Sequence, residues 1–311
     1  MTPFTSFALI GAGTLGSFVA KELIKQDGAS VKLFTRDASK PEMKQFQDLG
    51  ADIVQVDYSS QEDLQRALTG VDVVVSTISY VGYELQVDIA RAAKAAGVKL
   101  FVPSEFGVEV AEGMEAGKQV VRDALQAMQM PYTLFFPGAF ADIFHTYVAH
   151  RWRRHRRSSV ARIASDLKLI ASVSAFFDYN YAGGYINVVD KGDVPVSLTS
   201  RYDIARFVAH TLTTANPSDL LWAKVPFEAD RLTPLQIAEL AEKKLGKKIE
   251  IRSRPYADMK AEETTDFIAY LAVLLADGNG TAGDPADVSK AIEKFFPTWN
   301  PAKFDAFISD A

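Results

Sequence analysis

The sequence contains no cysteine in 311 residues. Disulfide bonds, thiolate zinc sites, iron–sulfur clusters and cysteine nucleophiles are therefore excluded. Long apolar runs are missing as well, because stretches such as residues 267–276 fall well short of the roughly 20 residues that span a bilayer. Neither charge is in large excess, since 34 lysines and arginines and 39 aspartates and glutamates give a net charge of −5. This balance creates no global positive field for nucleic acid or for an anionic membrane.

The first residues of the sequence do not resemble a secretion signal. The first ten residues include no lysine or arginine, and their apolar residues run directly into glycines. We therefore expect a cytoplasmic protein without membrane association. Its length corresponds to one large domain or two, since a domain averages roughly 150 residues.

Short apolar runs alternate with helical patterns through the first half of the chain. Such runs are typical of strands that are buried on both faces of a parallel sheet. Phe18, Leu23 and Ile24 mark a helix after the first run, and Ser59 with Glu62 forms a capping box for a later one. The expected strands are residues 7–10, 31–34, 52–56, 71–76, 98–102 and 132–136. Six strand–helix units predict a doubly wound α/β fold.

The second half predicts a smaller, discontinuous α+β lobe. Ser200 with Asp203 is placed to cap one helix, and Thr233 followed by a proline to open another. The remaining patterns indicate strands at 185–189, 196–199 and 248–252, and helices that end near 277–280 and begin at Asp284-Pro285. We expect three regions: a dinucleotide-binding domain at 1–149 with 185–214 packing back on it, a basic insertion and lid at 150–184, and a substrate lobe at 215–311.

One segment departs from the overall charge. Residues 150–168 contain seven lysines and arginines and a single acidic residue, Asp166. This segment therefore carries a charge of about +6, and the rest of the chain about −11. A basic arm for nucleic acid or a nuclear-import patch is one interpretation. We favour a solvated loop or helix face, because cationic runs usually lie on the surface and no other feature indicates DNA recognition.

The strongest motif is a GxGxxG sequence, Gly11-Ala-Gly-Thr-Leu-Gly16, between a predicted strand and a predicted helix. In such a loop the first glycine turns the chain, the second lets the backbone approach a pyrophosphate, and the third lets helix and strand pack closely. The helix N-terminus presents N–H groups to the anion. In this context the motif predicts a dinucleotide-binding Rossmann fold rather than an empty glycine turn.

The end of the second strand indicates which dinucleotide is bound. Arg36 comes first there and Lys40 follows four residues later, and cations at this place accommodate the 2′-phosphate of NADP. Asp37 argues for NAD, because a shift of one residue would place its carboxylate on the ribose. We expect NADPH or NADP as the cofactor.

The block Pro103-Ser-Glu-Phe-Gly107 follows the fifth predicted strand, where open α/β sheets have their ligand crevice. Local chemistry leaves a polar turn and a ligand site equally open. Together with the glycine loop and the segments 118–122 and 130–133, the block resembles NmrA-like and isoflavone reductase-like proteins, which are atypical short-chain dehydrogenases. The resemblance runs from about residue 5 to 145 and resumes from 177 to 206.

The resemblance implies roles for single residues. Lys118 matches the lysine that such reductases use as general acid or base, Arg122 a cofactor-contacting arginine, and Phe140 a residue beside the nicotinamide. Thr77 and Gln86 would lie along the cofactor. The implied cofactor-binding residues are Gly11, Ala12, Gly13, Thr14, Leu15, Gly16, Arg36, Lys40, Thr77, Gln86, Ser104, Arg122 and Phe140. The sequence departs from the family in a glycine loop that is one residue shorter and in the basic segment.

Two further patterns are interpreted as unrelated to catalysis. Tyr256 and Lys260 form the YxxxK motif of ordinary short-chain dehydrogenases, but they lie far beyond the predicted sheet. The four histidines lack the spacing of metal ligands, so no metal site is expected.

The combined prediction is an NADPH-dependent oxidoreductase that transfers hydride to a conjugated or aromatic carbonyl-type small molecule, with Lys118 as general acid or base. The alternative is an NADP-sensing regulator of the NmrA type, which binds the cofactor without turnover and acts through a protein partner, in the cytoplasm or the nucleus. The sequence does not determine the oligomeric state.

Overall fold

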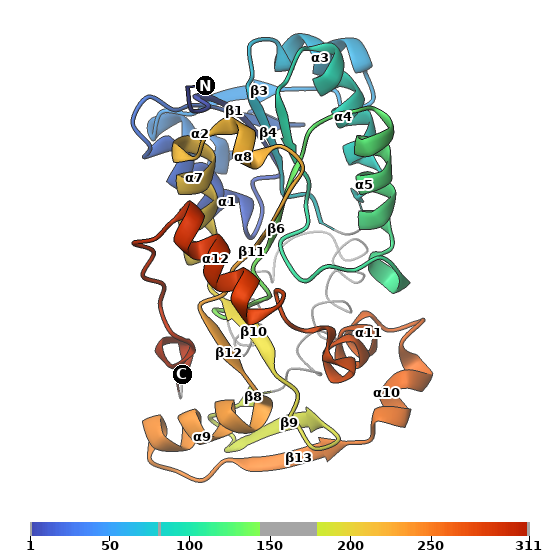
Figure 1. Cartoon of the computed structure of the whole chain (residues 1–311), viewed down its shortest axis with the longest axis vertical. Helices are drawn as coiled ribbons and strands as arrows, with labels where there is room; N and C mark the ends of the chain where they lie inside the picture. The colour runs from blue at the N-terminus through green and yellow to red at the C-terminus, as the bar shows by residue number, and fades with distance from the viewer. Residues whose placement is uncertain (1, 80–81, 144–178, 310–311) are drawn as a thin grey trace. The chain divides into compact units, whose positions relative to one another are not determined.

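A computed structural model describes residues 2–79, 82–143 and 179–309 (Figure 1). The chain forms two compact units, and each is assembled from three separate segments. The first unit comprises Met1–Phe136, Arg201–Phe227 and Gly283–Asn300, and the second Pro137–Ser200, Glu228–Ala282 and Pro301–Ala311. The basic segment between residues 150 and 168 lies outside the described residues.

A parallel sheet forms the centre of the first unit. Its strands are β1 (Ser6–Ile10), β2 (Ser30–Thr35), β3 (Asp52–Gln55), β4 (Val73–Ser76) and β5 (Leu100–Val102), in the order β3-β2-β1-β4-β5. A parallel bridge between Phe101 and Tyr132 leads on to β6 (Thr133–Phe136), which pairs with β11 (Ala223–Pro226). All six predicted strands of the first half are confirmed; the apolar side chains of five of them are buried, and those of β3 are half-buried.

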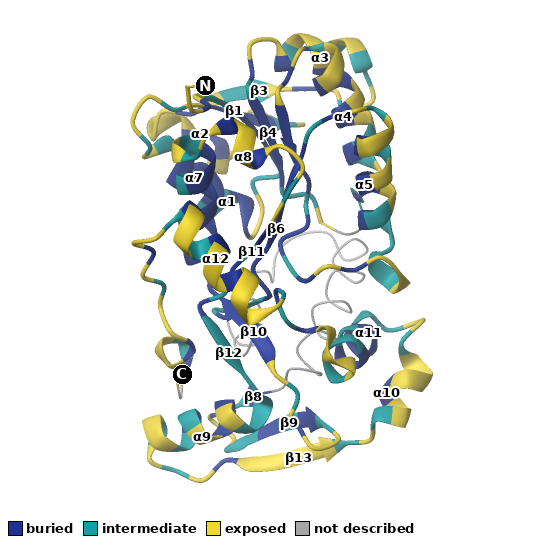
Figure 2. Ribbon diagram, viewed as in Figure 1, coloured by how far each residue is buried: buried dark blue, intermediate teal, exposed yellow. Residues whose placement is uncertain are grey.

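Helices cover both faces of this sheet. One face carries α1 (Gly16–Ile24), α2 (Pro41–Asp48) and α7 (Arg201–Thr214), and the other α3 (Gln61–Leu68), α4 (Leu85–Ala95) and α5 (Gly117–Ala127) (Figure 1). The short α8 (Pro217–Leu220) and α12 (Pro285–Phe295) complete the unit. Figure 2 shows the central strands buried and the outer sides of α3, α4 and α5 exposed. The predicted doubly wound α/β fold is confirmed.

One predicted helix cap is wrong by one residue. The N-cap of α3 is Ser60, whose hydroxyl accepts from the backbone N–H of Asp63. The Ser59 hydroxyl instead donates to Asp57 Oδ1 at 2.6 Å. Both serines stand three residues before an acidic residue, and the contact with Asp57 removes Ser59 from the helix.

The described residues of the second unit form two small sheets. The strand order is β12-β10-β7 in one and β13-β9-β8 in the other. Its strands are β7 (Ala139–Phe140), β8 (Tyr179–Asn180), β9 (Tyr185–Val189), β10 (Val196–Thr199), β12 (Asp230–Leu232) and β13 (Glu250–Arg254). In the part of this unit that the structure describes, the helices are α9 (Pro234–Leu245), α10 (Tyr256–Glu262) and α11 (Phe267–Leu274), the last followed by a π-helical segment, Leu275–Asn279.

The predicted start of α9 is confirmed in detail. Thr233 and Gln236 form a capping box, and Pro234 occupies the first helical position. Gly246 ends the helix in the left-handed conformation at φ 66°, which glycine adopts without a steric penalty. Asp284 likewise caps α12, as its pairing with Pro285 predicts.

Candidate functional site

The glycine loop connects β1 to α1 through a very close backbone approach. A Cβ atom on Gly16 would lie 1.9 Å from the Gly11 carbonyl oxygen and 2.3 Å from Thr77 Oγ1. Gly11 has φ +97°, and a Cβ there would lie 3.0 Å from the Thr77 carbonyl oxygen. The Thr77 hydroxyl donates to the Gly11 carbonyl oxygen, which links the glycine loop to the end of β4. Both glycines are therefore required by packing.

The middle of the loop faces open space. A Cβ atom on Gly13 would meet no atom within 4 Å, and Gly13 and Thr14 are exposed. Leu15, the N-cap of α1, makes no side-chain capping hydrogen bond. The first turn of α1 thus presents backbone N–H groups and the positive end of the helix dipole, which suits a phosphate anion.

The turn after β2 is basic and its acidic residue is already engaged. Arg36 and Lys40 are exposed, and neither has an ion-pair partner among the described residues. Asp37 Oδ1 accepts from the Ser39 hydroxyl at 2.6 Å and from the Ser39 backbone N–H at 2.9 Å. These bonds lower the pKa of Asp37. The turn therefore offers two cations to an anion and holds its carboxylate in a local loop.

Arg201, which the sequence analysis did not single out, lies beside the glycine loop. Its Nη1 donates to the Thr14 carbonyl oxygen at 3.4 Å. At the far end of the two helices, Thr213 Oγ1 donates to Gln26 Oε1 at 3.4 Å. Helices α1 and α7 therefore run in the same direction, with both N-termini at the carboxyl edge of the sheet. Thr14 and Arg201 are 187 positions apart in the sequence, so no local signal predicts this contact.

Ser104 and Gln86 connect two loops at the carboxyl edge of the sheet. The Gln86 side-chain oxygen accepts from the Ser104 N–H at 2.8 Å, and the Ser104 hydroxyl donates to the Ile78 carbonyl at 2.8 Å. Gln86 is only 1% exposed. These contacts hold the loop after β5 against the loop after β4, and a cofactor contact for either residue stays a prediction.

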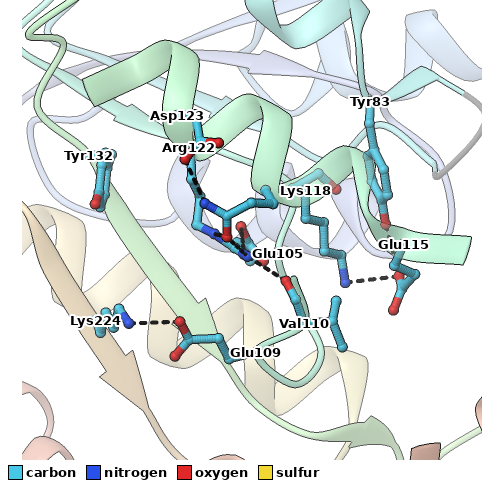
Figure 3. A network of polar contacts seen from close by, with 12 residues as sticks. Tyr83, Glu105, Glu109, Val110, Glu115, Lys118, Arg122, Asp123, Tyr132 and Lys224 are labelled. Atoms are coloured by element: carbon cyan, nitrogen blue, oxygen red, sulfur yellow. Dashed lines mark hydrogen bonds and ion pairs between the residues drawn. The ribbon is translucent and has the colours of Figure 1, made fainter. Parts of the chain in front are cut away.

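Arg122 lies within a buried polar network (Figure 3). Its Nη1 donates to Glu105 Oε1 at 2.8 Å, and its Nη2 donates to Gln119 and to the Val110 carbonyl. Glu105 Oε2 has no partner among the described residues. Burial raises the pKa of Glu105, and the Lys118 and Arg122 cations only partly oppose this rise. The arginine thus fixes the loop from 105 to 110, and its cofactor contact stays a prediction.

Lys118 lies in the first turn of α5 and is buried, with only 4% of its side chain exposed. Its Nζ forms an ion pair with Glu115 Oε1 at 2.9 Å. The same carboxylate oxygen accepts from the Tyr83 hydroxyl at 3.0 Å (Figure 3). The ammonium is 5.9 Å from the centre of the Tyr83 ring. Sequence reasoning found Lys118 but neither Tyr83 nor Glu115 as its partners.

The remaining predicted positions lie in the second unit. Phe140 is half-buried in β7. Tyr256 and Lys260 lie in α10, where the Tyr256 hydroxyl donates to Asp277 and Lys260 pairs with Glu263. Across the described residues of both units, no three histidine or acidic side chains are arranged to hold a metal ion. None of the helices in those same ranges is long and apolar enough to cross a membrane.

The sheet order and the match to a family model together identify the class and the family of this chain. A parallel sheet of order β3-β2-β1-β4-β5 with a glycine loop after β1 defines a Rossmann-type dinucleotide-binding fold. Within that class, the chain belongs to the NmrA-like family, whose model matches residues 7–308. The predicted family resemblance is confirmed.

Individual relatives carry reductase names. Isoflavone reductase homolog P3 of Arabidopsis thaliana is 34% identical over 149 residues, which cover 43% of this chain and 48% of that protein. The match to this relative therefore spans about half of its length.

Two solved structures share the fold over nearly the whole chain. AtPrR2 with NADP+ and (+)pinoresinol superposes with a TM-score of 0.76 at 21% identity, covering 99% of both chains. The leucoanthocyanidin reductase–NADPH complex from Vitis vinifera gives 0.74 at 21% identity, covering 96% of this chain and 97% of that one. At such identities the likeness establishes the fold.

Proposed function

We propose that this protein is an NADPH-dependent oxidoreductase that reduces a conjugated or aromatic carbonyl-type small molecule. The observation that carries the proposal is Lys118, a buried ammonium group on the helix that follows β5, in the same unit as the glycine loop. The carboxyl ends of parallel strands meet at one edge of a sheet, where open α/β proteins bind their ligands. Membership of the NmrA-like family and the reductase names of relatives support the same class.

The loop and the basic turn fit NADP(H). The open face of Gly13 and the first amides of α1 would hold the diphosphate, since a backbone without side chains lets the anion approach. Arg36 and Lys40 would hold the 2′-phosphate, and Asp37 does not compete because Ser39 binds its carboxylate. AtPrR2 and the Vitis reductase are complexes with NADP+ and NADPH, which agrees with this cofactor.

The chain's own contribution is proton transfer and orientation. Bound NADPH supplies a hydride to the substrate carbon. Lys118 Nζ donates a proton to the negative charge that develops on the substrate, and the neutral amine then regains a proton from water. Glu105 and Arg122 hold the neighbouring loop in place. The assignment of residues 215–311 to a substrate lobe stays a prediction, as do cofactor contacts by Thr77, Gln86, Ser104, Arg122 and Phe140.

The test combines binding with turnover. NADPH consumption is followed with three probe substrates: chalcone, 1,4-naphthoquinone and (+)-pinoresinol. We expect oxidation of NADPH with at least one probe, and a loss of about a hundredfold in kcat for Lys118→Met, since general acid catalysis contributes 10²–10⁴-fold. The Kd for NADPH is expected to stay within about twofold, because Lys118 does not contact the diphosphate or 2′-phosphate sites. Wild-type turnover by the variant would remove Lys118 from the mechanism.

The sensing alternative gives a different result in the same experiment. A regulator would bind NADP and NADPH with different affinities, and no probe would be consumed. Calorimetric titration of each cofactor form with the wild-type chain separates the two outcomes.

A further inference from the structure

We infer that Tyr83 and Glu115 are positioning residues that hold the Lys118 ammonium group in place for proton transfer. The inference rests on the proposed function, because it gives Lys118 two partners in that reaction. Glu115 lies at the end of a 3₁₀ turn, Gly113–Glu115, one helical turn before Lys118, and Tyr83 comes from the loop before α4. All three residues belong to the first unit.

A single carboxylate oxygen joins the three side chains. Glu115 Oε1 accepts from Lys118 Nζ at 2.9 Å and from the Tyr83 hydroxyl at 3.0 Å (Figure 3). The side chain of Glu115 is 12% exposed and that of Lys118 4%, so water screens this pair far less than a surface pair. The Tyr83 hydroxyl thus holds the same carboxylate oxygen that pairs with the ammonium. Lysine has a long flexible side chain, and such contacts select one of its conformations.

The position of the Tyr83 ring depends on a glycine. A Cβ atom on Gly117 would lie 3.0 Å from Tyr83 Cδ2 and 3.1 Å from its Cβ. A larger residue at 117 would therefore require the Tyr83 ring to shift by a few tenths of an ångström. Glycine lets the ring pack closely against the first turn of α5, with its hydroxyl on Glu115. Gly117 thus makes room for the Tyr83 ring directly beside Lys118, and Tyr83 in turn holds Glu115, the ion-pair partner of Lys118.

The backbone of Gly107 lies beside the ammonium. A Cβ atom on Gly107 would lie 3.6 Å from Lys118 Nζ, an ordinary contact distance. The titratable groups that face Lys118 are Glu115 and Tyr83, and the Glu105 carboxylate, which pairs with Arg122, also interacts electrostatically with the ammonium. Glu115 alone makes a direct ion pair with Lys118 among the described residues, so it is the group whose charge should matter most.

The experiment compares two variants with matched controls. Glu115→Gln removes the charge and keeps the size, and Glu109→Gln makes the same change in an exposed ion pair with Lys224 nearby. Tyr83→Phe removes one hydroxyl, and Tyr132→Phe does the same where the hydroxyl accepts from Gln126. Thermal unfolding and the Kd for NADPH verify that each variant folds and binds the cofactor. Glu115→Asp, which keeps the charge on a shorter chain, tests for partial rescue.

Glu115→Gln is expected to lower kcat about tenfold, the value of one charge-assisted hydrogen bond, with KM nearly unchanged. The alkaline limb of the pH–kcat profile should move to lower pH, because the variant lacks a carboxylate that attracts the proton to Lys118. Tyr83→Phe should lower kcat about threefold, as one neutral hydrogen bond is lost, without moving that limb. A purely structural role would reduce stability and leave the pH limb in place.

A second measurement needs no substrate. The pH dependence of Lys118 labelling by acetic anhydride is followed by mass spectrometry, since only the neutral amine reacts. Labelling of Glu115→Gln should begin at lower pH than that of the wild type, while Glu109→Gln should not differ. Unchanged labelling and an unchanged pH limb in Glu115→Gln would overturn the positioning role. If Lys118→Met is also fully active, the proposed reductase mechanism fails as well, so the two failures are distinguishable.

Discussion

Gly16 and Gly11 approach so closely that a Cβ atom on Gly16 would lie 1.9 Å from the Gly11 carbonyl oxygen. A Cβ atom on Gly13, which lies between them in the sequence, would meet no atom within 4 Å. The three glycines of one motif therefore separate into two that the fold requires and one that is free for a ligand.

Gly16→Ala should destabilise the first unit, and Gly13→Ala should not. We expect a loss of about 3 kcal/mol in the free energy of unfolding for Gly16→Ala, because the added methyl group forces the backbone apart. Gly13→Ala should stay within about 0.5 kcal/mol of the wild type and still bind NADPH more weakly. Urea denaturation with NADPH titration checks both variants. Equal destabilisation by the two would contradict the division of roles.

Arg36→Met should change cofactor preference. Loss of a guanidinium from the 2′-phosphate site is expected to weaken NADP binding at least tenfold and to leave NAD binding unchanged. Lys44→Met, which alters an exposed lysine in the neighbouring helix, is the control. Isothermal titration with both dinucleotides measures the effect. A parallel loss for NAD would indicate that Arg36 acts on the fold.

Arg201→Met should weaken binding of the diphosphate part of the cofactor. Its guanidinium lies at the glycine loop, whereas Arg36 lies after β2, so the two arginines should act on different parts of the ligand. We expect a fivefold to tenfold higher Kd for NADP, because about one charge-assisted contact is lost. The Kd for adenosine 2′-monophosphate should not change, because this ligand lacks the diphosphate. Arg36→Met should weaken both ligands. Weaker binding of adenosine 2′-monophosphate by Arg201→Met would refute this assignment.

Asp72→Asn should remove a pH-dependent part of the stability. Burial would raise the pKa of Asp72, but the Lys99 ammonium and the N–H groups of Thr5 and Ser6 outweigh it and lower the pKa. A carboxylate with a lowered pKa stabilises the fold above its ordinary value of 3.8, and this contribution is lost as the pH falls through the folded-state pKa. The variant should be less stable by about 1 kcal/mol at neutral pH and equal to the wild type in strong acid. Urea unfolding midpoints of the variant and the wild type, measured from neutral pH to strong acid, check that the two stabilities become equal as the pH falls.

The sequence predicts the sheet well because its signal is local. Six short apolar runs each become a strand, and Thr233 with Pro234 opens a helix as expected. The capping of α3 is wrong by one residue because two serines fit the same spacing, and the contact of Ser59 with Asp57 decides between them.

The candidate site is only partly predictable. The glycine loop and Lys118 belong to recognisable motifs. Tyr83 and Glu115 are 32 residues apart, and their hydrogen bond exists only after α4 and α5 pack side by side. Arg201 reaches Thr14 across most of the chain. No local spacing encodes such contacts, because they depend on the tertiary arrangement of whole helices.

The interleaving of the two units has a consequence for synthesis on the ribosome. When the first 136 residues have emerged, β6 still lacks its neighbour β11, and α1 still lacks its neighbour α7. An unpaired strand edge and an uncovered apolar helix face both favour aggregation. The nascent chain must keep these surfaces apart from other chains until residues 201–227 are translated, so pauses before that point are where misfolding should concentrate.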